Sequence, residues 1–492
     1  MKISSNIKDF RNQVFGIYVA FFIKVKQKLN QAMKKLLSFV LLSLVLFLGC
    51  SEKDNNKSTE PVNSLSRASC IGCHSDYNHL KAVHTPDPPE PGGAGCGGET
   101  PHIEPYDRVF LGGPGFEDFK NDIHGKIPCE SCHGGIANTD DKKLAHSGNF
   151  IKKPSANPEV ACGRCHPNIV NQAKNSLHEQ GWGQKNMVTL RSGLGNIPSA
   201  FNNLSEEMKK GYDKNCAKCH ASCGDCHVMR PKAGGGGLYR AHKFVKSPDM
   251  VDHCTTCHTS RGGHAYFGVA PGTVPDVHLT KRGFTCMNCH NKNEIHGDGQ
   301  IYDQRYKMPL MPECKDCHSG INNSNAFHSV HINTFSCNVC HSQDYNNCGS
   351  CHIGGEGARI PSYLGYKIGM NPIPSIKPTY KYALLRRSLM APDSWKEYGT
   401  ANLANFNVAP TYKYATPHNI QKITPRTGFK NASGQWVTYS NCREGCHIIK
   451  NPDGSFKNKN LYLFNSDCLE WERPANVNII VDGKLPPNWQ VN

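Results

Sequence analysis

The stretch that decides the fold reads Cys216-Ala217-Lys218-Cys219-His220-Ala221-Ser222-Cys223-Gly224-Asp225-Cys226-His227. It contains the unit Cys-x-x-Cys-His twice, and the same unit occurs ten times in the 492 residues. Its paired cysteines are Cys70 and Cys73, Cys129 and Cys132, Cys162 and Cys165, Cys216 and Cys219, Cys223 and Cys226, Cys254 and Cys257, Cys286 and Cys289, Cys314 and Cys317, Cys337 and Cys340, and Cys348 and Cys351. The histidines that close the ten copies are His74, His133, His166, His220, His227, His258, His290, His318, His341 and His352. The two thiols and the imidazole recur together, so the repeat is a chemical one.

The chemistry of the unit points to covalently bound haem. Two thiols separated by two residues can form thioether bonds to both vinyl groups of one haem, and the histidine that follows can bind the iron. Zinc sites also use Cys-x-x-Cys pairs, but neither zinc nor a disulfide framework demands a histidine after every second cysteine. Histidine makes up only 25 of 492 residues, which excludes ten chance copies. The sequence therefore predicts ten haem c groups, each with its motif histidine as proximal ligand.

A related segment near the C-terminus, Cys442-Arg443-Glu444-Gly445-Cys446-His447, has three residues between its cysteines. Because the histidine keeps the same offset, we expect Cys442 and Cys446 to attach an eleventh haem, with His447 as proximal ligand. The alternatives are a local structural pair, or a disulfide between Cys442 and Cys468. Cys96 has no motif around it and is either a free thiol or the disulfide partner of Cys468.

Fourteen histidines lie outside the motifs, and eleven irons would need eleven ligands on their second faces. A supply this close to the demand is expected if most haems are bound by two histidines. The distal candidates are His84, His124, His146, His178, His242, His253, His264, His278, His296, His328, His331 and His418. The other two are His79 and His102. We expect about ten of the fourteen to bind iron, with His418 equally well explained as a packing residue.

Three of these histidines stand shortly before a motif: His124, His278 and His331. A histidine there cannot easily reach over its own haem, so each is expected to bind a neighbouring one. Methionine can replace a distal histidine and raise the potential. Met187, Met229 and Met308 are the candidates for that exchange.

The N-terminus resembles an export signal. A basic start at Met33-Lys34-Lys35, the apolar run from Leu36 to Leu48, and Gly49-Cys50 are typical of a bacterial lipoprotein leader. The run is too short to span a membrane. We therefore interpret residues 1–49 as the leader, with translation starting at Met33 and lipidation at Cys50. Phe47 stands where that pattern prefers leucine, and an uncleaved anchor is the alternative.

The net charge of +16 does not indicate a nucleic-acid partner. Residues 1–49 hold eight Lys or Arg against Asp9 alone, so the leader carries much of that charge. The rest is spread without a long basic run, and haem propionates would offset it. Nucleic-acid binding is therefore rejected.

The spacing of the motifs predicts closely packed haems. His220 and Cys223 are three residues apart, so their Cα atoms lie within about 10 Å, and His341 to Cys348 is a similarly short connection. The predicted fold class is a multihaem cytochrome fold, with short α-helices and irregular loops packed around a haem chain and little β-structure. Helices are expected over Pro167 to Gln180 and over Ser205 to His220, with Ser205 as N-cap. A strand is expected over Val477 to Val481.

Composition divides the chain into five parts. After the leader, residues 50–66 are polar and predict a flexible tether. Residues 67–352 form the ten-haem domain, and residues 353–441, rich in Tyr and Pro, are interpreted as an extended wrap across it. Residues 442–492 form a C-terminal segment with the expected eleventh haem.

Residues 67–352 resemble the multihaem c-type cytochromes that bacteria use for periplasmic and outer-surface respiration. The resemblance rests on the repeated motif, the tight pair from Cys216 to His227, and the lipoprotein-like leader. It implies electron transfer through ten or eleven haems, mostly bound by two histidines, between a respiratory donor and an outer-membrane or extracellular acceptor. It also implies that other redox proteins are partners and that the chain is an outer-membrane lipoprotein facing the periplasm or the surface. Oligomers or filaments are compatible with the resemblance, which does not decide between them.

The alternative is a multihaem oxidoreductase with one open or Lys-ligated haem. Members of that kind reduce nitrogen or sulfur oxyanions or oxidise hydroxylamine. Nitrite reductases commonly mark the active haem with Cys-x-x-Cys-Lys, which does not occur in this sequence. We therefore expect an electron carrier without substrate chemistry of its own.

Overall fold

The computed structural model of the chain describes residues 68–88, 102–269, 272–321, 324–345, 366–387, 390–441 and 443–491. They belong to one compact unit, Ser64–Asn492. Several predictions lie outside the described residues: the leader with Cys50, the tether, Cys96, the tenth motif from Cys348 to His352, and Cys442. Within the described ranges, no helix is both long enough and apolar enough to cross a membrane.

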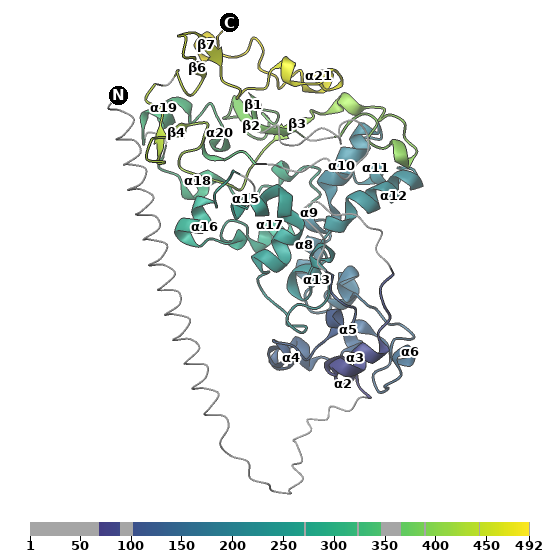
Figure 1. Cartoon of the computed structure of the whole chain (residues 1–492). Helices are drawn as coiled ribbons and strands as arrows, with labels where there is room; N and C mark the ends of the chain where they lie inside the picture. The colour runs from purple at the N-terminus through teal and green to yellow at the C-terminus, as the bar shows by residue number, and fades with distance from the viewer. Residues whose placement is uncertain are drawn as a thin grey trace, which may run out of the picture. The chain divides into compact units, whose positions relative to one another are not determined.

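Short helices joined by turns form most of the described ranges from residue 68 to residue 345 (Figure 1). Their bounds are α2 Cys70–Ser75, α3 Tyr77–Val83, α4 Phe116–Asn121, α5 Glu130–His133, α6 Lys142–Ala145, α7 Pro158–Ala161, α8 Pro167–Ala173, α9 Leu177–Gln180, α10 Trp182–Arg191, α11 Ser199–Asn202, α12 Glu206–Asn215, α13 Cys223–His227, α14 Thr255–His258, α15 His264–Tyr266, α16 Val277–Arg282, α17 Lys292–His296, α18 Cys314–Cys317, α19 Ala326–His331 and α20 Cys337–His341. Among these helices of the described ranges, only α10 and α12 reach ten residues. Helices this short are not stable alone, so other contacts must hold them.

Eight of the motifs that the structure describes lie on single helical turns. Six of them contribute residues to α2, α5, α13, α14, α18 and α20, and two more lie on the 3-10 turns Ala217–Cys219 and Cys286–Asn288. A turn of helix directs the two thiols and the imidazole of one motif to the same side of the backbone. Local structure therefore prepares each motif to hold one group.

The two helix predictions have different outcomes. Ser205 is the N-cap of α12, as predicted, and its side chain accepts a hydrogen bond from the backbone N–H of Met208. The helix ends at Asn215 instead of continuing to His220. The single helix predicted over Pro167 to Gln180 is wrong, because Ser176 accepts from the N–H of Glu179 and caps a second helix, so the stretch divides into α8 and α9.

A three-stranded antiparallel sheet follows the helices, in the order β1-β2-β3. The strands are β1 Lys367–Met370, β2 Tyr382–Arg387 and β3 Tyr412–Tyr414. Ile368 pairs with Leu384, and Leu385 pairs with Tyr414. Two hairpins complete the β-structure: β4 Gly428–Lys430 with β5 Trp436–Thr438, and β6 Ile448–Lys450 with β7 Phe456–Asn458. The segment interpreted as an extended wrap thus contains a sheet.

The sheet is buried on both faces. Tyr382 and Leu384 pack into a cluster with Phe335 and Val339, which flank or belong to α20. Ala383 and Leu385 point to the opposite side, into a cluster with Leu463 and Ile479. Alternation along β2 therefore sends successive side chains into two cores. A third cluster, around Trp395, packs against α10 and α12.

The strand predicted over Val477 to Val481 is wrong. The chain there follows α21, Arg473–Asn476, and the N–H groups of Ile479 and Ile480 donate to the carbonyl of Asn476 in a turn. The segment nevertheless lies beside the sheet, since Met370 N–H donates to Ile479 O at 2.8 Å. Ile479 and Val481 are buried while Val477 is exposed, and the turn that Asn476 closes prevents a strand.

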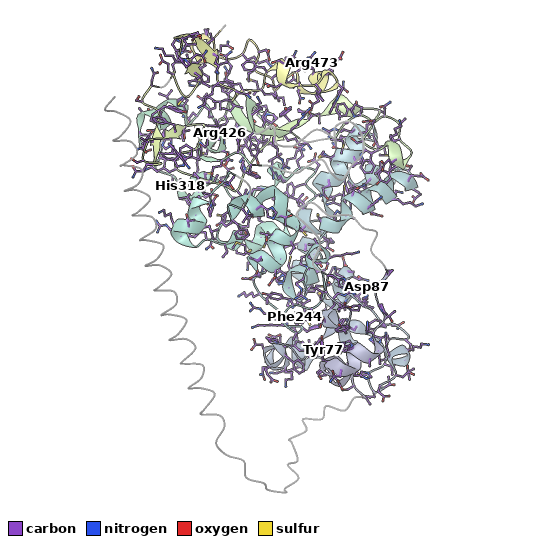
Figure 2. All side chains as sticks on the ribbon, in the orientation of Figure 1. Tyr77, Asp87, Phe244, His318, Arg426 and Arg473 are labelled. Atoms are coloured by element: carbon purple, nitrogen blue, oxygen red, sulfur yellow. The ribbon has the colours of Figure 1, made fainter. Side chains whose placement is uncertain are left out.

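Arg426, labelled in Figure 2, joins the β-rich part to α20. Its guanidinium donates to the carbonyl oxygens of Val339 at 2.7 Å and of Ser342, at the C-terminal end of that helix. A cation at a helix C-terminus satisfies carbonyls that lack partners within the helix. The ninth motif, on α20, is therefore fixed against the segment that leads to β4.

Candidate metal centres

One continuous cavity of about 4330 Å³ runs through the described residues. This is several times the volume of a site for one small molecule, which is about 300–1,000 Å³. All ten of the motif histidines that the structure describes line it, counting His447. So do thirteen of the fourteen other histidines, and only His264 is not among the lining residues. The motif histidines and nearly all the other histidines therefore lie along the same cavity.

Eighteen of the histidines that line the cavity form nine pairs. In each pair, a motif histidine faces a histidine from outside the motifs, with ring centres 6.0–6.2 Å apart. The pairs are His74 with His146, His133 with His242, His166 with His124, His227 with His296, His258 with His178, His290 with His418, His318 with His278, His341 with His328, and His447 with His331. No pair joins two motif histidines or two of the others.

This spacing fits a metal ion between the two rings. An imidazole nitrogen binds a metal at about 2.0–2.1 Å, and its ring centre lies roughly 1.1 Å behind, so two opposed imidazoles on one ion have centres about 6.2 Å apart. Among the described residues, no group of three or more His, Cys, Asp or Glu could hold a metal ion. Two opposed imidazoles fit an ion whose other ligands come from a planar group, as in haem. The two thiols beside each motif imidazole fit its attachment.

Nδ1 of most motif histidines has a fixed partner. The partners are Val109 O for His74 (3.1 Å), Ile151 O for His133 (3.0 Å), Val245 O for His227 (2.7 Å), Gln421 O for His341 (3.1 Å), the Glu294 carboxylate for His290 (2.9 Å) and the Tyr462 hydroxyl for His447 (2.7 Å). A carbonyl or carboxylate accepts the Nδ1 proton, which leaves the Nε2 lone pair for a metal. Such outer contacts orient metal-binding histidines in general.

The facing histidines are oriented in the same way. His124 and His278 donate to carboxylates two residues earlier in the chain, Asp122 at 2.6 Å and Asp276 at 2.9 Å. Backbone carbonyls serve His146 and His331 at 2.8 and 2.9 Å. The sequence interpretation missed these acids, although the spacing Asp-x-His is visible in it. Glu294 was missed too, four residues after His290 on α17.

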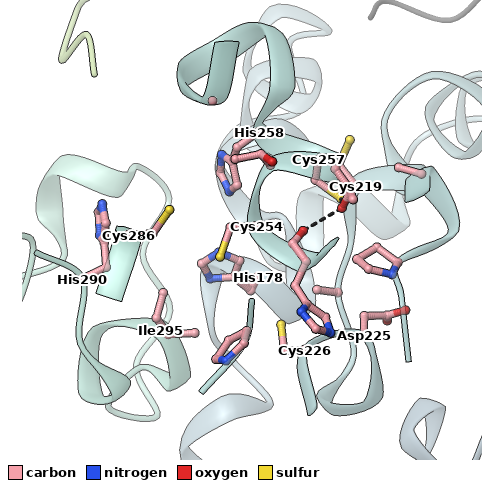
Figure 3. A pocket seen from close by; sticks show the side chains of 18 of the residues that line it. His178, Cys219, Asp225, Cys226, Cys254, Cys257, His258, Cys286, His290 and Ile295 are labelled. Atoms are coloured by element: carbon pink, nitrogen blue, oxygen red, sulfur yellow. Dashed lines mark hydrogen bonds between the residues drawn. The ribbon is translucent and has the colours of Figure 1, made fainter. Parts of the chain in front are cut away.

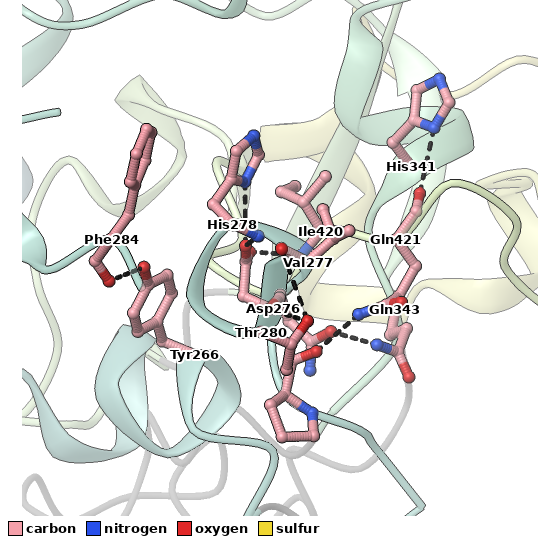
Figure 4. A network of polar contacts seen from close by, with 12 residues as sticks. Tyr266, Asp276, Val277, His278, Thr280, Phe284, His341, Gln343, Ile420 and Gln421 are labelled. Atoms are coloured by element: carbon pink, nitrogen blue, oxygen red, sulfur yellow. Dashed lines mark hydrogen bonds and ion pairs between the residues drawn. The ribbon is translucent and has the colours of Figure 1, made fainter. Parts of the chain in front are cut away.

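Figure 4 shows how one network orients two neighbouring centres. Asp276 accepts from the His278 ring and, through its other oxygen, from the backbone N–H of Ile420 at 2.6 Å. The next residue, Gln421, offers its carbonyl to His341. A single extended segment therefore holds the distal histidine of the eighth motif and the proximal histidine of the ninth.

Burial favours the neutral form of several of these imidazoles by lowering their pKa. It lowers the pKa of His242, His418 and His447 to about 4. A neutral imidazole is the form that binds metals. His290 differs, because its hydrogen bond to Glu294 raises its pKa. The carboxylate makes that ring a stronger electron donor.

The three histidines expected to reach past their own motifs do face histidines of other motifs: His124 faces His166, His278 faces His318, and His331 faces His447. His418 faces His290. The structure does not pair three of the distal candidates with any motif histidine that it describes.

The unpaired candidates have other contacts. His84 stacks edge-on against Tyr106. His253 accepts from the N–H of Asp249 through Nδ1, which places its own proton on Nε2, away from the metal-binding tautomer. His264 lies outside the cavity lining. Of the methionines, Met187 accepts a contact from the Lys413 ammonium and Met308 is buried away from the cavity lining.

Thiols of different motifs touch and order the motifs in space. Thiol–thiol hydrogen bonds join Cys70 with Cys129, Cys162 with Cys223, Cys254 with Cys286, Cys314 with Cys337, and Cys219 with Cys257. Four further pairs of thiols lie close enough to raise one another's pKa: Cys132 and Cys162, Cys226 and Cys254, Cys289 and Cys317, and Cys340 and Cys446. Numbered from the N-terminus, the motifs run first, second, third, fifth, sixth, seventh, eighth, ninth and then the C-terminal one. We call this sequence of nine the main line.

The fourth motif branches from the main line. Its Cys219 meets Cys257 of the sixth motif (Figure 3), and the third motif connects past it to the fifth. Close sequence spacing therefore does not make the fourth and fifth motifs successive members of the line. No family model, curated protein or solved structure matches this chain.

Proposed function

We propose that this chain is an exported multihaem c-type cytochrome that transfers electrons along its main line. The observation that carries the proposal is the set of nine imidazole pairs, each with one motif histidine and each spaced for one metal ion. When bound, haem supplies an iron that alternates between its ferric and ferrous states. The Cys-x-x-Cys thiols would hold each haem, and the paired imidazoles would bind both faces of its iron.

The paired imidazoles suit electron transfer better than catalysis. With a protein ligand on each side, no coordination position is left for a substrate, and the fixed Nδ1 partners hold both rings in place through a change of charge. Burial of the rings keeps water away and tunes each potential. These residues would thus fix the position of each haem and set its reduction potential, which are the two requirements of an electron carrier.

Eleven haems are favoured over ten. His447 faces His331 at 6.2 Å, its Nδ1 is held by Tyr462, and Cys446 lines the same cavity as the other motifs. This is the arrangement of the regular motifs, so the lengthened segment fits the same role. It stands at the end of the main line, next to the ninth motif.

We further propose that the line connects redox partners at its two ends, near the first and the C-terminal motifs. Electron donors and acceptors would be other redox proteins or extracellular acceptors, and a lipid at Cys50 would tether the chain to the outer membrane. These proposals rest on the leader and on the resemblance given above.

The test uses the mature protein purified from a host that attaches haem c. Intact mass should show eleven covalent haems, and electron paramagnetic resonance of the ferric protein should be dominated by low-spin signals. As a variant, His146→Ala should leave the mass contribution of haem unchanged and convert one low-spin centre to high-spin. His84→Ala is the matched control and should change neither. A matured protein without the absorption bands of covalent haem would overturn the proposal.

A further inference from the structure

The backbone that carries His242, the histidine facing His133 of the second motif, is left-handed. Arg240, Ala241 and His242 have φ values of +45°, +53° and +69°, and among the described residues they are the only ones other than glycine with a positive φ. This conformation is unfavourable at each position, because Cβ crowds the carbonyl oxygen that follows. Strained residues of this kind concentrate at ligand clamps and switch regions. The second motif therefore meets its facing histidine on a strained turn.

Hydrogen bonds on both sides of the turn fix its ends. Tyr239 N–H donates to Val228 O at 3.0 Å before the turn, and Val245 N–H donates to His227 O at 2.8 Å after it. The Val245 carbonyl also accepts from Nδ1 of His227 at 2.7 Å, so the second anchor belongs to the fifth motif. Residues 240–244 therefore lie between two fixed points, and they can change conformation without moving either one.

His242 also lacks the outer contact that orients other facing histidines. Five of the nine have a hydrogen-bond partner at Nδ1: His124, His146, His278, His328 and His331. Among the histidines of the described ranges, only His242 has a buried Nδ1 without a partner. When Nε2 binds a metal, Nδ1 carries the ring proton, and a buried donor without an acceptor is costly. An imidazole without an acceptor behind it is also a weaker electron donor to the metal.

The surroundings of His242 are apolar. The centre of its ring lies 4.8 Å from that of Phe119 and 5.3 Å from that of Phe244, and Ala241 beside it is buried. An anion would lose its hydration among these side chains, whereas a small neutral molecule loses little. A ligand that takes the place of His242 is therefore expected to be neutral.

We propose that His242 is an exchangeable ligand, which leaves the second centre in its ferrous state and is replaced by a small neutral diatomic molecule, carbon monoxide or nitric oxide. In the exchange, the bond from Nε2 of His242 to the metal breaks and one bond to the incoming molecule forms, with no electron gained or lost. The turn can then return to negative φ, and the Nδ1 proton can reach water. Relief of strain thus favours exchange at this centre over the other eight pairs. The inference rests on the proposed function, because it requires haem at the second motif.

Carbon monoxide is the probe, added to the full holoprotein after reduction with dithionite and followed by visible spectra. Wild type should bind one molecule per chain. The fourth motif is not expected to contribute, because the Tyr212 hydroxyl lies 2.9 Å from Nε2 of His220. His242→Ala should keep the haem count by mass and still bind one molecule, but faster, because no histidine has to leave first. His146→Ala opens the first centre instead and should bind two.

These counts separate the inference from the proposed function. If wild type binds no carbon monoxide, or if His242→Ala binds two molecules per chain, the inference is overturned. The proposed electron transfer would survive either result as long as the low-spin haems are present. Absence of covalent haem would overturn the proposed function itself.

Substitution of Arg240 tests the role of strain. Arg240→Gly removes Cβ at a φ of +45°, so the turn becomes less strained and His242 should bind the metal more tightly. The affinity for carbon monoxide should fall about tenfold relative to Arg240→Ala. Arg240→Ala is the matched control, because it removes the contact of the guanidinium with the Tyr239 ring, 5.1 Å from its centre, but keeps Cβ. Equal affinities in the two variants, or a higher affinity in Arg240→Gly, would contradict the inference.

Discussion

Replacing Glu294 with glutamine should raise the reduction potential of the seventh centre by about 100 mV. Both carboxylate oxygens of Glu294 lie 2.9 Å from Nδ1 of His290, and the side chain is only 7% exposed. His290 faces His418 with ring centres 6.1 Å apart, so a metal bound midway would lie about 3 Å from each centre. The carboxylate charge is then about 7 Å from the metal.

The magnitude follows from the charge that is lost. At an effective dielectric constant of about 20, a unit charge about 7 Å away contributes about 2.4 kcal/mol. A tenfold change in an equilibrium constant is about 1.4 kcal/mol and, for one electron, about 59 mV. The negative carboxylate favours the ferric state, so its removal raises the potential by about 100 mV. Glutamine keeps an oxygen that can accept the Nδ1 proton, which isolates the effect of charge.

Potentiometric titration followed by visible and paramagnetic resonance spectra measures this shift. One component of the titration should move upward while the others stay in place. Glu117→Gln is the matched control, because that carboxylate is 76% exposed and ion-paired with Lys120. Its effect should stay below about 20 mV, since water screens it. If Glu294→Gln moves no component by more than the control does, the assigned link from Glu294 through His290 to a metal is wrong.

Three other perturbations have definite expected outcomes. Glu472→Gln should lower the free energy of unfolding by about 3–5 kcal/mol, because it leaves the buried Arg387 without a carboxylate partner. Urea titrations followed by circular dichroism measure this loss, and the double variant Arg387→Met/Glu472→Leu should recover much of it. His331→Ala should convert one low-spin centre to high-spin without changing the haem count by mass, and His264→Ala should do neither; equal spectra for both would exclude the pairing with His447. Cys468→Ser should leave the haem count unchanged, since this buried thiol contacts Asn476 and belongs to no motif; a lost haem would contradict that.

Much of the local structure was predictable where a single side chain decides it. Ser205 caps α12 because a hydroxyl three residues before a free N–H meets it in any context. The break at Ser176 follows the same rule and could have been predicted from it. The outcome for Val477 to Val481 could not be predicted. The segment has β-propensity, but Asn476 closes a turn there, and Ile479 packs against the neighbouring sheet without joining it as a strand.

The C-terminal core also depends on tertiary contacts. Residues 353–441 are rich in Tyr and Pro, a composition from which we predicted an extended wrap. In the structure, Tyr382 and Tyr412 are almost fully buried in a sheet that packs on α20 and on residues near Leu463. Pairing of β1, β2 and β3 joins residues far apart in sequence, and no local pattern states that register.

The sequence by itself determined where each proposed metal centre would be anchored and which imidazole accompanies each pair of thiols. These three side chains lie within five or six residues, so the covalent geometry of one helical turn keeps them together wherever the chain goes. Only the tertiary structure decided which distant histidine faces each motif, which motifs are neighbours, and that His220 faces a tyrosine instead. Those relations depend on the path of the whole backbone, and separation along the chain carries little information about separation in space.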